Sequence, residues 1–280
     1  MFRALSYHLA KRSFRLFERL GFHITPDHYY SPIPTVSKLR PEVFTKTYDC
    51  IGIDWNLSEQ RHLLETVFPK YLSEFVPKPN SGLTLVDAFV LYAMIRERKP
   101  KIMVEIGAGD TTKISLEALE ANKREGHEFR FYSVEPYPRA DLKELRRRDF
   151  VLIERDAQDV LVETLADADV LFIDSSHVCK IGSDVNYEIL ELIPRLKKGA
   201  IVHWHDITIP QNYWKDWIQT GNMFWNESYV VHAFMLFNNA FKILWAARYL
   251  QLYYFEDLRR RFPYLTDAHR MMSFWVERIT

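Results

Sequence analysis

The chain of 280 residues has little of several residue types that mark particular classes of protein. It has only two cysteines, Cys50 and Cys179, which excludes a disulfide-rich scaffold and a four-cysteine zinc site. Nine glycines and 13 prolines exclude a collagen-like or low-complexity chain. Because sparse cysteine is typical of proteins in a reducing compartment, we expect a cytoplasmic protein.

Neither sign of charge is in excess, since 37 basic residues are matched by 37 acidic ones. A protein that binds nucleic acid through its overall charge has a basic surplus, so we expect no nucleic-acid partner. Long apolar runs are also missing. The best candidate, residues 228–250, contains His232, Lys242 and Arg248. A membrane-spanning helix needs about 20 nearly uncharged apolar residues, so we expect no transmembrane span.

The N-terminal residues 1–22 have the pattern of one helix with two faces. Leucines recur there at helical spacing among mostly basic charges: Leu5, Leu9, Leu16 and Leu20 on one side, and Lys11, Arg12, Arg15 and Arg19 on the other. Such a helix needs a surface against which its apolar face is buried. We expect that surface to be the rest of the chain or the second subunit of a homodimer, and an anionic membrane surface is the alternative.

Residues 23–58 form an arm rich in proline and aromatic side chains, because proline at this density blocks regular helix. Helices are predicted over residues 59–76 and 83–98. We therefore divide the chain into an N-terminal extension over residues 1–82, consisting of helix, arm and cap, and a main domain over residues 83–280.

From residue 102 onward, short apolar runs alternate with helical patterns. Strands are predicted over residues 102–106, 129–135, 150–153, 168–174 and 200–204, and helices over residues 112–123, 160–165, 185–196 and 226–237, with a short one through Leu142 and Leu145. Two last strands, 241–245 and 273–279, are expected to pair antiparallel. The fold class is therefore α/β: a Rossmann-like, seven-stranded, mostly parallel sheet with an antiparallel edge strand and an N-terminal helical extension.

Glycines, acids and other polar residues lie in the last positions of the predicted strands or just after them. This is the edge where doubly wound sheets bind ligands. These residues are Glu105, Gly107, Gly109 and Thr111 at the first strand, Glu135 at the second, Asp156 after the third, Asp174 and His177 at the fourth, and His203, His205 and Asp206 at the fifth. The two glycines permit a tight turn and close approach of a ligand to the backbone. The carboxylate of Glu135 is placed to accept hydrogen bonds from both ribose hydroxyls, and Asp156 lies where an adenine edge would be read.

The residues after the first predicted strand distinguish between two kinds of nucleotide-binding loop. A dinucleotide-binding loop has a third glycine, and this chain has Thr112 at that position. The pattern Glu-x-Gly-x-Gly, followed by the distant Glu135, resembles the cofactor loop of class I S-adenosylmethionine-dependent methyltransferases. The resemblance implies that residues 83–280 form a methyltransferase catalytic domain. The predicted cofactor contacts are Glu105, Gly107, Gly109, Thr111, Glu135, Asp156 and Asp174, with Tyr30 from the arm.

Residues 172–177 and 199–207 resemble one branch of that superfamily, the macrocin-type sugar O-methyltransferases, which are often dependent on a divalent metal. The resemblance implies that acids at the ends of the fourth and fifth strands hold a magnesium ion. The matching positions are Asp174, His205 and Asp206. His205 departs from the expected pair of acids. Because imidazole suits softer ions than magnesium, iron, manganese or zinc are alternatives.

On this basis we expect methyl transfer from S-adenosylmethionine to a hydroxyl of a small-molecule or peptide acceptor. Asp174, His177 and His205 are the predicted catalytic residues, because an alcohol acceptor must lose a proton. Three alternatives remain open. They are N-methylation of an amine or peptide by the same fold, a metal-dependent oxidoreductase or hydroxylase, and a cofactor-binding scaffold without activity.

Two polar residues near this site also have a structural interpretation. His203 falls inside a predicted strand, so its side chain is expected to point into a face covered by helices. Asp184 lies where a helix begins and would favour the helix dipole there.

Overall fold

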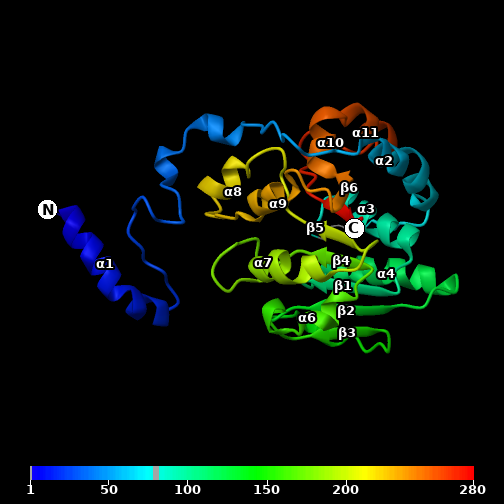
Figure 1. Ribbon diagram of the computed structural model, residues 1–280, viewed down its shortest axis with the longest axis horizontal. Coiled ribbons are helices and arrows are strands. Elements are labelled where there is room, and N and C mark those ends of the chain that lie inside the picture. Colours follow the sequence, from blue (N-terminus) through cyan, green and yellow to red (C-terminus); the bar gives the residue numbers. More distant parts are fainter. Residues whose placement is uncertain (1, 78–81) are drawn as a thin grey trace. The chain divides into compact units, whose positions relative to one another are not determined.

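The computed structural model describes residues 2–77 and 82–280, and it describes side chains from Leu9 onward (Figure 1). The chain divides into two compact units. One contains the residues up to Lys46 together with Asn212–Phe224, and the other contains Thr47–Gln211 and Trp225–Thr280. Every strand of the sheet belongs to the second unit.

The second unit is built on a sheet of seven strands. They are β1 (Ile102–Ile106), β2 (Arg130–Val134), β3 (Phe150–Ile153), β4 (Val170–Ile173), β5 (Ile201–Trp204), β6 (Phe241–Ala246) and β7 (Phe274–Arg278). Their order across the sheet is β3-β2-β1-β4-β5-β7-β6. Strands β1 to β5 are parallel, and β7 runs antiparallel to both β5 and β6. The predicted Rossmann-like sheet with antiparallel pairing at one edge is confirmed.

Helices cover both faces of this sheet (Figure 1). The longer ones are α3 (Leu85–Arg98), α4 (Asp110–Arg124) and α9 (Glu227–Met235), and the shorter ones are α2 (Leu57–His62), α5 (Ala140–Lys143), α6 (Val162–Ala166), α7 (Asp184–Tyr187), α10 (Ala247–Tyr253) and α11 (Phe255–Arg261). Met103 of β1 packs in the core that contains α3 and α4. Val104 packs in the core that contains the residues of α6 and α9. Successive strand side chains point to opposite faces, which explains the division.

Two predicted helices change their winding before they end. The predicted helix over 59–76 begins at α2, continues as a π turn over Leu63–Val67 and ends as a 3₁₀ turn over Phe68–Tyr71. The predicted helix over 185–196 likewise passes from α7 through a π turn into a 3₁₀ turn over Ile193–Arg195. A proline stands in each 3₁₀ turn, and proline lacks the amide hydrogen that a continuing α-helix requires.

The prediction missed the helices α10 and α11, which follow β6. Each of these helices has only 7 residues and contains one buried leucine, Leu250 in α10 and Leu258 in α11. A helix of this length is too short to show a clear helical period in the sequence. Both helices nevertheless place these leucines in the core that contains α3.

The first unit contains α1 (Phe2–Arg19) and α8 (Lys215–Gln219), with 3₁₀ turns over Val36–Lys38 and Pro41–Phe44. The helix predicted for residues 1–22 is confirmed. Within this unit the amide of Asn212 donates to the carbonyl of Val43 at 2.5 Å. Leu9, Leu16 and Leu20 are 67%, 59% and 61% exposed. The expectation that another surface covers these leucines stays a prediction.

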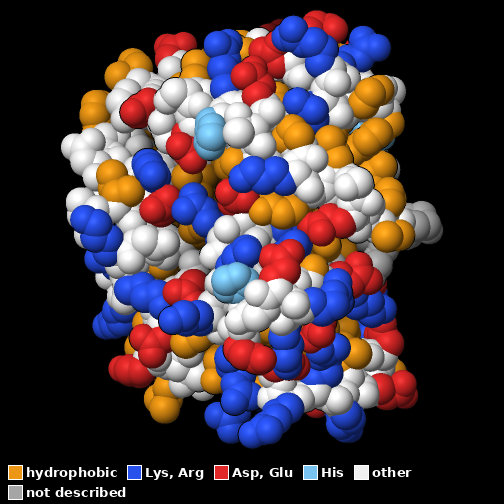
Figure 2. All heavy atoms as spheres, turned by 90° about the vertical axis from the view of Figure 1, so that its right-hand side faces the viewer, with side chains coloured by type: hydrophobic (Ala, Val, Ile, Leu, Met, Phe, Trp, Pro, Cys, Tyr) orange, Lys and Arg blue, Asp and Glu red, His pale blue; other side chains and the backbone are white. Residues whose placement is uncertain are grey.

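Charged side chains of both signs are interspersed on the face of the molecule seen in Figure 2, as the equal counts lead one to expect. Charged residues of the chain also form ion pairs, such as Arg139 with Asp110 and Asp141. Among the helices that the structure describes, none has the length and apolar character needed to span a membrane.

Candidate functional site

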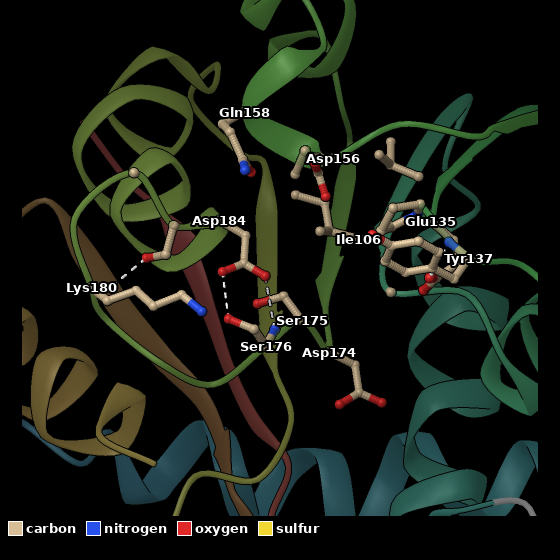
Figure 3. Close-up of a pocket in the computed structure, with 16 residues that line it drawn as sticks. Ile106, Glu135, Tyr137, Asp156, Gln158, Asp174, Ser175, Ser176, Lys180 and Asp184 are labelled. Carbon is tan, nitrogen blue, oxygen red and sulfur yellow. Dashed lines mark hydrogen bonds between the residues drawn. The ribbon is translucent and has the colours of Figure 1, made fainter. Parts of the chain in front are cut away.

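A pocket of about 430 Å³ opens at the carboxyl ends of the central strands (Figure 3). Its walls come from the residues that follow β1, β2, β3 and β4, and from the loop that leads to α7. The order of strands reverses between β1 and β4, so the pocket lies at the switch point of the sheet. Four predicted cofactor residues line it: Gly107, Glu135, Asp156 and Asp174.

Gly107 is required by its backbone and by its neighbours. Its φ is 90°, in the region that favours glycine. A Cβ atom on this residue would lie 1.8 Å from the carbonyl oxygen of Asp174. Its amide also donates to the carbonyl of Val134 at 2.9 Å. The turn after β1 therefore fits tightly between the ends of β2 and β4.

Gly109 differs from Gly107, although the motif pairs them. Its φ is −162°, an extended value that any residue adopts, and a Cβ atom there would meet nothing within 4 Å. Its amide donates to the hydroxyl of Thr112 at 3.0 Å, at the start of α4. Its contact with a cofactor stays a prediction.

Glu105 is completely buried beneath the turn rather than in the wall of the pocket. Its carboxylate accepts hydrogen bonds from Thr111 at 2.7 Å, from Thr112 at 2.6 Å and from Ser133 at 2.6 Å. Burial raises the pKa of Glu105 to about 7, although these hydroxyls act in the opposite direction. In this geometry Glu105 and Thr111 fix the cofactor loop to α4 and β2. Direct contact of either with a cofactor stays a prediction.

Glu135 lies in the wall of the pocket at the end of β2 (Figure 3). Its carboxylate accepts from the amide of Tyr137 at 2.8 Å and from that of Ala108 at 3.3 Å. These two bonds hold it beside the turn after β1. Asp156 lies in the same pocket just before the 3₁₀ turn Ala157–Asp159.

A second group of polar side chains adjoins the pocket through Asp174. Asp174, His177 and Asp206 each offer one ligand atom, and these atoms lie within 4.8 Å of one another. Nε2 of His177 is 3.3 Å from Oδ1 of Asp174 and 3.3 Å from Oδ2 of Asp206. We call these three residues the Asp-His-Asp cluster.

Two members of the cluster have unusual backbone conformations. His177 has a φ of 58° and Asp206 a φ of 56°, in the left-handed region. Each such residue costs roughly 1 to 3 kcal/mol and persists only where its surroundings fix it. The fold therefore holds both side chains in place at an energetic cost.

Negative charge is concentrated around the imidazole of His177. Burial alone lowers the pKa of His177, but hydrogen bonds with Asp174 and Glu227 and the charges of Glu227 and Asp206 raise it to about 11. Burial alone raises the pKa of Asp174, but the hydrogen bond with His177 and the charge of His205 lower it. Three carboxylates around one imidazole make this location attractive to a cation.

His205, one of the predicted metal ligands, is not a member of the Asp-His-Asp cluster. Its Nδ1 lies 3.2 Å from Oδ1 of Asp206 and 3.8 Å from Oδ1 of Asp174. Its Nε2 is buried with no hydrogen-bond partner among the described residues. Burial lowers the pKa of His205, but Asp206 and Asp174 raise it to about 9. The geometry favours His177 over His205 as the nitrogen ligand, and the role of His205 stays a prediction.

His203 is fully buried in the middle of β5, as its structural interpretation requires. Its ring stacks on Phe172 at 4.3 Å and lies 4.5 Å from the ring of Trp275. Burial and the charge of His205 hold the pKa of His203 well below its ordinary value. Asp184 begins α7 as expected and also lines the pocket.

Glu227 is a site residue that the sequence analysis missed. It is the first residue of α9, and its Oε2 accepts from Nδ1 of His177 at 2.8 Å. It comes 50 positions after His177 in the chain. No strand end or motif marks it, so a glutamate at a helix start was the only signal. Tyr30 belongs to the first unit and is 83% exposed, and its role stays a prediction.

The Asp-His-Asp cluster fits a divalent metal ion by the chemistry of its donors. Two carboxylates and one imidazole suit manganese, iron or zinc, and the carboxylates also suit magnesium. The unpartnered Nε2 of His205 and Oε1 of Glu227 are further buried polar atoms beside it. The set differs from the predicted one by a single imidazole.

Comparisons with known proteins give a match to a domain family and a sequence relative. Residues 104–207 match the family model described as "Methyltransferase domain". An uncharacterized protein of Archaeoglobus fulgidus is 31% identical over 167 residues, which span 50% of this chain and 72% of that protein.

Two solved structures are more distant. The SAH-bound methyltransferase PaMTH1 of Podospora anserina is 15% identical, with a TM-score of 0.47, and the match covers 85% of this chain and 93% of that one. The O-methyltransferase TomG of Streptomyces achromogenes, solved with SAM, is 13% identical, with a TM-score of 0.44, and the match covers 81% of this chain and 97% of that one.

Proposed function

We propose that this chain, which belongs to the same family as the Archaeoglobus fulgidus protein and matches a methyltransferase domain over residues 104–207, is an S-adenosylmethionine-dependent methyltransferase that methylates a hydroxyl oxygen with the help of a divalent metal ion. The observation that carries the proposal is the position of Asp174. It lines the pocket proposed for the methyl donor, and it is also a member of the Asp-His-Asp cluster. The methyl donor and the acceptor hydroxyl would thus both lie beside Asp174.

The pocket supports binding of S-adenosylmethionine at the ends of β1 to β4. Gly107 lets the backbone approach the methionine part of the donor. Glu135 would accept the ribose hydroxyls, and Asp156 would lie beside the adenine. Methyl transfer is an in-line displacement from a sulfonium, so these residues act mainly by orienting the donor and excluding water.

The acceptor hydroxyl must lose its proton as the methyl group is transferred. Asp174, His177 and Asp206 would hold the metal ion, which when bound lowers the pKa of a coordinated hydroxyl. His205 lies beside Asp206 but outside this trio. A cation held by Asp174 and Asp206 would offset the negative charge that raises the pKa of His205, so its neutral ring is our candidate for accepting the proton. An amine acceptor needs no such metal, and the cluster therefore favours O-methylation over N-methylation.

Glu135→Ala is expected to weaken binding of S-adenosylmethionine by about 1.5 to 3 kcal/mol, the scale of a hydrogen bond to a charged group. Titration calorimetry measures the change. The matched control is Glu144→Ala, at an exposed glutamate outside the pocket, which should bind as wild type does. An unchanged dissociation constant for Glu135→Ala would rule out the ribose contact.

Exhaustive chelation is expected to remove most methyl transfer, and added Mg²⁺ or Mn²⁺ should restore it. The assay follows labelled methyl groups from S-adenosylmethionine into a panel of hydroxyl and amine acceptors, including peptides. Binding of the donor without the metal should persist, since Gly107, Glu135 and Asp156 line the pocket and lie outside the cluster. Full activity after chelation, with no metal found by elemental analysis, would leave the Asp and His residues as a metal-free acid–base set. Binding of S-adenosylmethionine without transfer to any acceptor would favour a cofactor-binding scaffold.

A further inference from the structure

We infer that Glu227 is the positioning residue for His177: by accepting a hydrogen bond from Nδ1–H, it directs Nε2 towards Asp174 and Asp206. The inference rests on the proposed function, because positioning matters for a cation held by this cluster. Glu227 lies outside the residues that match the methyltransferase domain, which end at residue 207.

The contact between the two side chains is short and fully enclosed. Nδ1 of His177 lies 2.8 Å from Oε2 of Glu227. The side chains of His177 and Glu227 are 7% and 1% exposed. Water is therefore excluded from this bond, and a hydrogen bond between a carboxylate and an imidazole is strong in such surroundings.

The backbone of the same helix start holds the loop that carries His177. The amides of Asn226 and Glu227 both donate to the carbonyl of His177, at 3.1 and 3.2 Å. The side-chain oxygen of Asn226 accepts from the amide of Cys179 at 2.6 Å. The ring of Trp225 lies 4.4 Å from the ring of His177. These contacts explain how His177 keeps its left-handed φ.

An imidazole ring has two different nitrogens, and the partner of one decides what the other can do. Because Glu227 accepts a hydrogen bond from Nδ1–H, the proton that a bound cation would displace is the one on Nε2. The lone pair of Nε2 would then face the space between the two aspartates. A carboxylate behind a ligating histidine also makes the imidazole more basic. Such partners typically change metal affinity by about 10- to 100-fold.

The unpartnered oxygen of Glu227 also argues against a purely structural role. Its Oε1 is buried with no hydrogen-bond partner among the described residues. Burying such a group is unfavourable, and an apolar side chain would fill the same space at a lower cost. We therefore infer that the Glu227 carboxylate does more than occupy the space between α9 and the loop that carries His177.

The test uses the full chain and Mn²⁺ alone, with titration calorimetry as the readout. Glu227→Ala should weaken Mn²⁺ binding by about 10- to 100-fold. Glu227→Gln keeps an oxygen that accepts from Nδ1 and should recover most of that loss. If the alanine variant does not fold, Glu227→Leu replaces it, since leucine fills similar volume without an acceptor. The matched control is Glu188→Gln, another fully buried glutamate, whose carboxylate accepts a hydrogen bond from the hydroxyl of Ser175. Its loss of Mn²⁺ affinity should be much smaller than that of Glu227→Ala.

A second readout, which needs no metal, is the ring proton of His177 in ¹⁵N-histidine NMR spectra, assigned with His177→Asn. The Nδ1 proton should be protected from exchange in wild type and Glu227→Gln, and lost in Glu227→Ala. If wild type binds no Mn²⁺, the metal in the proposed function is wrong, and this proton alone decides whether Glu227 positions the ring. Mn²⁺ affinity within twofold of wild type in the alanine variant, or a protected proton that survives there, overturns the inference.

Discussion

Gly107→Ala is expected to abolish measurable binding of S-adenosylmethionine and to destabilise the fold by about 2 to 5 kcal/mol. A left-handed backbone costs about 1 to 2 kcal/mol in a residue with a Cβ, and overpacking adds about 1 to 3. Here the added carbon would lie 1.8 Å from the backbone oxygen of Asp174, so the ends of β1 and β4 must move apart. That movement displaces Asp174 from both the pocket and the Asp-His-Asp cluster.

Urea unfolding and titration calorimetry measure the two effects separately. Gly109→Ala is the matched variant, because a Cβ there meets nothing within 4 Å. Gly109→Ala should unfold at the same urea concentration as wild type, whatever the substitution does to the affinity for S-adenosylmethionine. Wild-type stability and affinity in Gly107→Ala would show that the turn after β1 is looser than its geometry indicates.

Asp174→Asn is expected to lower metal affinity and the rate of methyl transfer by at least about 100-fold, the upper end of the range for residues that only support a ligand. The amide keeps the shape of the side chain and removes the negative charge that a cation needs. Asp184→Asn is the matched control, because Asp184 lines the same pocket but accepts its hydrogen bonds from Ser176. It should leave metal affinity close to wild type.

The same assay separates the two imidazoles. His177→Asn should weaken the metal more than His205→Asn, because Nε2 of His177 lies between the two aspartates while His205 lies outside the trio. If Asp174→Asn and Asp184→Asn lose affinity equally, the effect comes from the charge of the whole pocket and the cluster is not a specific site.

The parallel strands β1 to β5 and their ends could be predicted from the sequence because each is a short, mostly apolar run followed within a few positions by polar residues. Glu135, Asp156 and Asp174 follow from this rule, since parallel strands bring their carboxyl ends to one edge. All three line the pocket.

The choice between His177 and His205 could not be predicted. Both follow a strand within four residues, and only the backbone conformation decides which ring lies between the aspartates. His177 turns inward through a left-handed φ, and sequence gives no direct measure of that angle.

Glu227 lay beyond prediction for another reason, because its contact with His177 joins positions 50 residues apart. The burial of Glu105, in contrast, had a signal in the sequence. In β1 it alternates with Val104 and Ile106 and so shares a face with Met103, which is covered by α4. A carboxylate on that face had to find its partners inside the protein, and it finds them in three hydroxyls.

One measurement tests the central claim most directly: an anomalous-difference map from crystals grown with Mn²⁺ and S-adenosylhomocysteine. The account predicts a manganese peak bounded by Asp174, His177 and Asp206. It also predicts density for the nucleoside beside Glu135 and Asp156. If the nucleoside is bound but no manganese peak lies at this cluster, the metal-assisted methylation of a hydroxyl is contradicted.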